Sequence, residues 1–228
     1  MFTTHRLFRI AIIGCAALFG LQATWLIVPE MSRPTAAGDP SVPAESEDRR
    51  AAAERAARFA VIRGDLWAEL ALTYSGLVWS DGRSISRRPT RQSVEEARAI
   101  AAHALSHSPH DARVWLLLAA LNNLTEDTDR HTAAALKMSY YTGPNEIKLI
   151  PLRLLVAVRP GVLADEELQD LFRYELGSII SRKPELKPAI VAAYREATPA
   201  ARRLIEEEAV SHRDEQLLAM IRSGAGAR

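Results

Sequence analysis

The feature that most constrains this chain is an uninterrupted apolar run from Ile10 to Val28. It reads IAIIGCAALFGLQATWLIV and contains no charged residue over its 19 positions. At about 1.5 Å of rise per residue, a helix of this length spans roughly the 30 Å hydrocarbon core of a bilayer. Trp25 lies near the far end, where amphipathic aromatic residues favour the membrane interface, and Pro29 is expected to close the helix. The run therefore predicts one transmembrane helix at residues 10–28.

Three other interpretations of the run remain open. The first is a cleaved signal peptide, although its apolar core would be shorter and a small-residue cleavage site would follow promptly. The second is a lipoprotein, because Ile12-Ile13-Gly14-Cys15 resembles a lipobox, but the run continues for 13 residues beyond Cys15. The third is a helix buried in a globular core. Cys15 is the only cysteine, so no disulfide can form within the chain.

Charges on the two sides of the run predict its orientation. Arg6 and Arg9 precede it, whereas Arg33 is the only basic residue in the first stretch after it. The positive-inside rule then places a tail of residues 1–9 in the cytoplasm and the rest of the chain outside, which in a bacterium means an inner-membrane protein with a periplasmic domain. Residues 29–48 contain four prolines and almost no large apolar residue, which predicts an extended linker.

The remaining residues, 49–228, are expected to form one all-α domain. Alanine, leucine, arginine and glutamate dominate, and apolar residues recur with helical periodicity. The chain has 29 basic and 28 acidic residues; setting aside Arg6, Arg9 and Glu30, which flank the run, leaves 27 of each. This balance argues against a nucleic-acid partner, which needs a basic face. Helices are predicted near 47–62, 65–79, 92–107, 111–123, 129–141, 145–158, 164–182, 187–196 and 199–222.

Two pairs of these predicted helices carry a shared spacing of aromatic and small residues. The first pair has W-x2-L-A-x2-Y from Trp67 and then A-x3-A-x2-A-x4-P from Ala97. The second pair has Trp115, Leu118 and Ala119 at the corresponding places and ends at Gly143-Pro144-Asn145. These motifs resemble the tetratricopeptide repeat over residues 50–150, and the resemblance is poor over 150–185. It also departs from the family at an insertion, 80–91, and at Asn122, where a tyrosine is expected.

The resemblance implies antiparallel helix pairs in a short right-handed superhelix, with a concave groove that binds other proteins. Each tryptophan would pack at a helix crossing, Trp67 against Ala97 and Ala101 and Trp115 against Ala133 and Ala134. First helices line the groove in this family, and four polar residues at those positions are the partner-binding candidates: Asp65, Ser75, Arg113 and Asn123. The apolar residues at groove positions are Ala68, Leu72, Leu116 and Ala120, of which the two leucines would serve equally well in helix packing.

One constellation suggests chemistry instead. His103 and His107 are four residues apart on a predicted helix, a spacing that can chelate zinc. No glutamate lies between them as in H-E-x-x-H, and solvated histidines at a helix end are the simpler interpretation. The sequence has no phosphate loop, no G-x-S-x-G motif and no catalytic cysteine.

These features predict a membrane-anchored scaffold of the bacterial envelope that binds a protein partner, with neither catalysis nor a cofactor. By analogy with anchored members of the family, envelope polysaccharide or secretion machinery is a plausible setting. The first alternative is a metal-dependent enzyme that uses His103 and His107. The second is a structural oligomer subunit that assembles through its membrane span and C-terminal helices.

Overall fold

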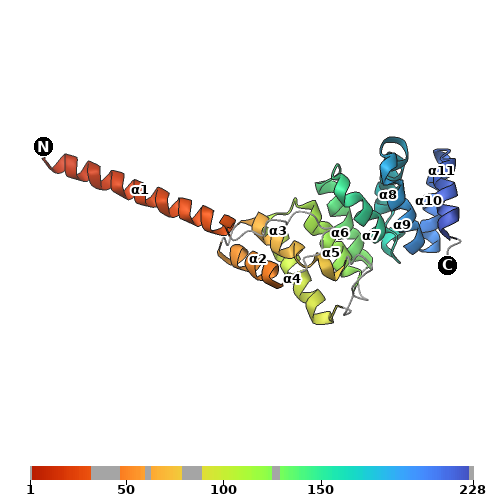
Figure 1. Cartoon of the computed structure of the whole chain (residues 1–228), viewed down its shortest axis with the longest axis horizontal. Helices are drawn as coiled ribbons and strands as arrows, with labels where there is room; N and C mark the ends of the chain where they lie inside the picture. Colours follow the sequence, from red (N-terminus) through yellow and green to blue (C-terminus); the bar gives the residue numbers. More distant parts are fainter. Residues whose placement is uncertain (1, 32–46, 60–62, 79–88, 125–128, 226–228) are drawn as a thin grey trace.

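The computed structural model describes residues 2–31, 47–59, 63–78, 89–124 and 129–225 (Figure 1). Within these ranges every regular element is a helix, so the predicted all-α class is confirmed. The α-helices are α1 Phe2–Met31, α2 Glu47–Phe59, α3 Gly64–Leu72, α4 Arg91–His107, α5 Ala112–Asn122, α6 Asp129–Thr142, α7 Ile150–Ala157, α8 Glu166–Arg182, α9 Lys187–Glu196, α10 Pro199–Ser211 and α11 Glu215–Ala225. Short 3-10 turns occupy Ser75–Leu77, Ile147–Leu149, Val162–Ala164 and Pro184–Leu186.

Helix α1 projects away from the other helices at one end of the molecule (Figure 1). Its segment Phe8–Trp25 is long and apolar enough to cross a membrane, and none of that segment is buried inside the protein; a signal sequence would share these properties. The helix does not end at Pro29 as predicted but continues to Met31. Pro29 lacks an N–H and therefore removes one backbone hydrogen bond from the final turn, but it does not end the helix at that residue. Most of the predicted linker, 32–46, lies outside the described residues, and α2 begins at Glu47.

Helices α2 to α11 form a stack that follows the chain order along the long axis of the molecule (Figure 1). Every helix from α2 onwards packs against the next one in the sequence. In addition, each odd-numbered helix from α3 to α11 packs against the next odd-numbered one, and α6, α8 and α10 pack against one another in turn. The stack therefore has two layers, and this arrangement continues to α11, well beyond residue 150 where the repeat motif fades.

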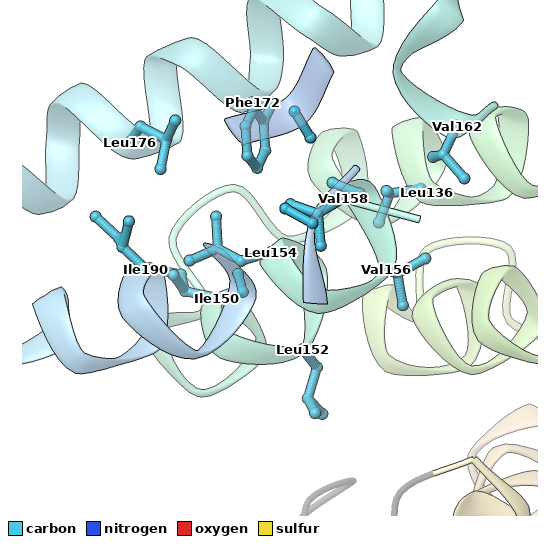
Figure 2. Close-up of a cluster of buried hydrophobic side chains, with 14 of the residues drawn as sticks. Leu136, Ile150, Leu152, Leu154, Val156, Val158, Val162, Phe172, Leu176 and Ile190 are labelled. Atoms are coloured by element: carbon cyan, nitrogen blue, oxygen red, sulfur yellow. The ribbon is translucent and has the colours of Figure 1, made fainter. Parts of the chain in front are cut away.

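The core of the stack divides into two clusters that meet at α5. The first cluster joins α2 to α5 and is rich in alanine, whose small side chain lets helices approach closely. The second joins α5 to α11 with larger residues; Figure 2 shows Phe172 and Leu176 of α8 facing Leu154 and Ile190 of the two neighbouring odd-numbered helices. Trp115 packs against both clusters and thereby ties them together.

The predicted tryptophan packing is correct only in part. Trp67 and Trp115 pack against the core, but both are half-buried rather than fully enclosed. Ala97, Ala101 and Ala133 are buried as expected, whereas Ala134 is exposed, so the predicted register of α6 is wrong at that residue. Ala133 and Leu136 instead carry the buried face of α6, which is the ordinary three-residue step of a helix.

The predicted single helix 199–222 is wrong, because it divides into α10 and α11. Arg213 has a left-handed φ of 53°, its N–H donates to the Val210 carbonyl, and the Asp214 N–H donates to the Ala209 carbonyl. This pair of bonds is a Schellman motif, which usually places glycine at the left-handed residue. Asp214 then caps α11 by accepting from the Leu217 N–H at 2.9 Å.

Replacing Arg213 by glycine should therefore stabilise the chain by about 1 kcal/mol, because glycine adopts the left-handed conformation without a steric penalty. The change is measured as the free energy of unfolding in urea. Arg213→Ala is the matched control; it removes the same charge but keeps a β-carbon, so its stability should stay close to that of the parent. Equal stability of the glycine and alanine variants would contradict the expectation.

Candidate functional site

The structure separates the four residues predicted to contact a partner. Asp65 is exposed at the start of α3 and pairs with Arg63 at 2.6 Å. Arg113 and Asn123 are half-buried at the two ends of α5. Ser75 is only 1% exposed, so its hydroxyl is not presented to a partner in this structure. The 3-10 turn that follows α3 directs Ser75 inward, a change of backbone that the helical spacing of the repeat did not anticipate.

The apolar residues at groove positions are also enclosed. Ala68, Leu72, Leu116 and Ala120 are all buried, which supports the interpretation that the leucines serve in helix packing. On the predicted groove face of α3 and α5, the accessible residues are therefore the polar ones near the helix ends. Residues 80–88 of the predicted insertion, 80–91, lie outside the described residues.

Arg113 is held in place by the residue that caps its own helix. Its Nε and Nη2 donate to the two carboxylate oxygens of Asp111 at 3.1 and 2.7 Å, and the same carboxylate accepts from the Arg113 and Val114 N–H groups. The hydrogen bond to Asp111 raises the pKa of Arg113. The Arg113 side chain is 29% exposed, so it is partly accessible to solvent, and a guanidinium can bind a carbonyl or carboxylate of a partner.

A row of rings lies beside the N-terminal end of α3. The rings of Trp67 and His103 meet edge to face with centroids 4.2 Å apart, and those of His103 and His107 do so at 4.9 Å. Gly64 permits this approach, because a β-carbon there would lie 2.8 Å from the His107 backbone. Sequence reasoning selected both histidines but missed their contact with Trp67. Among the described residues, no group of three or more His, Cys, Asp or Glu side chains is placed to hold a metal ion.

A second polar group, which was not predicted, lies buried in the larger core cluster. Arg153 of α7 is 0% exposed; its Nε donates to the Ser139 hydroxyl at 3.1 Å, and its Nη2 donates to the carbonyls of Ser139 and Gly143. Its Nη1 lies 3.9 Å from Glu175 Oε1 and has no hydrogen-bond partner within the described ranges. Tyr140 donates to Glu175 Oε2 at 2.7 Å. We call Ser139, Tyr140, Arg153 and Glu175 the buried polar network.

The buried polar network connects four helices, α5 to α8, around one guanidinium. Arg153 donates to the Ser139 carbonyl in the last turn of α6 and to the carbonyl of Gly143, which follows that helix; each carbonyl also accepts a backbone N–H. The Ser139 hydroxyl in turn donates to the Ala112 carbonyl at the start of α5. The arginine inside the apolar stretch IPLRLLVAV was the available sequence signal, since a charged residue there must find buried partners.

Burial shifts the ionisation of the network. Burial raises the pKa of Glu175 to about 7, although the Tyr140 hydrogen bond and the Arg153 charge act in the opposite direction. Burial also raises the pKa of Tyr140 and lowers that of Arg153. A perturbed carboxyl can mark a functional site, but this network is enclosed on all sides, which favours a structural role.

Comparison with known proteins adds no relative: no family model, no curated protein and no solved structure matches the chain.

Proposed function

We propose that this chain is a single-pass membrane protein whose helical stack binds a protein partner and performs no catalysis. In this proposal α1 is the anchor, the stack has a tetratricopeptide-like architecture, and the domain faces the periplasm of a bacterium. The partner would belong to an envelope assembly.

The observation that carries the proposal is the combination of an unburied apolar helix with a two-layer stack. An apolar helix with no burial inside the protein requires another apolar environment, and a bilayer supplies one. Stacked helices that pack mainly against near neighbours expose an extended surface, and proteins of this architecture use that surface for binding. Arg6 and Arg9 precede the span, whereas an acidic stretch follows it. This difference in charge supports an orientation with the N-terminus in the cytoplasm.

Within the stack, the proposed docking surface is the polar rim of the odd-numbered layer, defined by Asp65, Arg113 and Asn123. All three side chains reach solvent, and they come from two adjacent helices, α3 and α5, that pack against each other. Polar groups at such a rim fix the register of a partner more than they add affinity.

The anchor is tested by fractionation of a bacterial host that expresses the chain. The full chain should remain in membranes after an alkaline wash, and a variant that begins at residue 47 should be released. Protease added to spheroplasts should digest the stack if it is periplasmic. A soluble full-length chain, or a mature N-terminus near Thr35 or at Cys15, would overturn the anchor.

The docking surface is tested by site-specific photocrosslinking in the same cells. A photoreactive residue at position 65, 113 or 123 should yield a discrete adduct with one partner. Positions 92 and 203 are matched controls, because Gln92 and Arg203 are exposed on even-numbered helices. Adducts that are equally abundant from the control positions, or absent from all three rim positions, would contradict the proposed surface.

A further inference from the structure

The last turns of α4 carry two imidazoles that face the same side of the helix. His103 and His107 are both exposed, and their ring centroids lie 4.9 Å apart with an angle of 75° between the ring planes. The pair therefore has access to solvent and needs no rearrangement of the backbone to act together.

This separation fits two rings bound to one metal ion. Imidazole nitrogens bind zinc at about 2.1 Å, and with a near-tetrahedral angle at the metal this places two ring centroids roughly 5 Å apart. Imidazole suits zinc, nickel and copper, whereas calcium and magnesium prefer oxygen ligands.

The surroundings of the pair hold it in position. Trp67, anchored against the first core cluster, contacts the His103 ring at 4.2 Å and restricts its rotation. The close approach of Gly64 keeps α3 against the last turn of α4. The pair also lies at the C-terminal end of α4, where the partial negative charge of the helix dipole favours a cation.

We propose that His103 and His107 together bind one divalent transition-metal ion, of the zinc, nickel or copper class. Two protein ligands leave the remaining coordination positions open, so water or a donor from a bound partner would complete the shell. Such an open site differs from a closed structural zinc site and does not hold the fold together. The inference is independent of the proposed protein-binding function, because it depends only on the two imidazoles and their neighbours.

The test is calorimetric titration of the tag-free, detergent-solubilised full chain with Ni²⁺, and then with Zn²⁺. We expect one saturable equivalent, and His103→Gln or His107→Gln should weaken its affinity by about tenfold or more. His131→Gln is the matched control, since His131 is exposed on α6, and its affinity should equal that of the parent. Circular dichroism of each variant separates loss of binding from loss of folding.

Fluorescence gives an independent measurement at the site. Cu²⁺ bound by the pair should quench the emission of Trp67, so most of the quenching should disappear in Trp67→Phe while the calorimetric affinity for Ni²⁺ persists. The proposal is overturned if folded His103→Gln and His107→Gln variants bind Ni²⁺ as the parent does. A parent chain that shows no saturable heat with Ni²⁺ or Zn²⁺ would overturn it equally.

Discussion

Arg153→Ala should lower the free energy of unfolding by about 3–5 kcal/mol, the usual cost of removing one partner from a buried ion pair. The substitution leaves the Glu175 carboxyl buried without its cation, and it removes the Arg153 hydrogen bonds to the carbonyls of Ser139 and Gly143, each of which keeps one backbone N–H donor. Both losses occur where α6, α7 and α8 meet, so the loss should appear in the cooperative unfolding of the second core cluster. Urea denaturation followed by circular dichroism measures it.

The control for Arg153 is an arginine on the surface of the same region. Arg159 lies 3.9 Å from Glu196 with 42% of its side chain exposed, and such pairs contribute little. Arg159→Ala should therefore change the stability by less than about 0.5 kcal/mol. A similar small loss for Arg153→Ala would show that water reaches the network and that its burial contributes nothing.

A double variant tests the role of the ionised carboxylate. Adding Glu175→Gln to Arg153→Ala removes the unpaired buried charge, so it should recover part of the loss at pH 8. The recovery should shrink at pH 5, where the carboxyl of Glu175 is protonated in either background. A double-mutant cycle at the two pH values separates this coupling from the lost hydrogen bonds.

The second large effect is a pH dependence that originates at Glu175. Its pKa is about 7 in the folded protein against an ordinary value of 4.5, so the folded chain binds the proton more tightly than the unfolded chain. The stabilisation from the neutral carboxyl is therefore complete below pH 4.5 and is lost as the pH rises through 7. The shift corresponds to about 3 kcal/mol between these limits.

Glu175→Gln should remove this dependence, because the amide does not titrate. Relative to the parent, the variant should become progressively more stable as the pH rises from about 5 to 8. Asp165→Asn is the control: the Lys137 hydrogen bond lowers the pKa of Asp165 from its ordinary value of 3.8, so its contribution is lost only at more acidic pH and its difference from the parent should not change between pH 5 and 8. A stability difference between Glu175→Gln and the parent that does not change with pH would contradict the assignment.

Sequence periodicity was sufficient to predict that the helices exist, but it did not predict every boundary between them. The alanines of α4 are spaced for close packing, and the structure buries Ala97, Ala101 and Ala104 as that spacing predicts. The break at Arg213 could not be predicted, because it depends on a left-handed residue that is not glycine. The burial of Ser75 could likewise not be predicted, because a short 3-10 turn changes the direction in which its side chain points.

The repeat motif fades near residue 150, although the helices predicted beyond that point are part of the same stack. The repeat motif requires small residues at helix crossings, and α8 has Phe172 and Leu176 where small residues were expected. Packing tolerates such a change when neighbouring side chains complement its volume, so the layers persist while the motif does not. The buried polar network joins residues from separate helices, and their proximity is a tertiary property that a local pattern does not contain.

The order of the helices in space has a consequence for how the molecule loses structure. Because each helix from α2 to α11 packs mainly against helices one or two places away in the sequence, we expect the stack to lose structure as a one-dimensional chain of coupled units does. Terminal units such as α11 have neighbours on one side alone, so they can fray while the centre stays intact. A destabilising substitution in the middle of the stack, in contrast, divides it into two shorter stacks. Arg153 lies at such a point, and the half that contains α2 to α5 retains its own alanine-rich core.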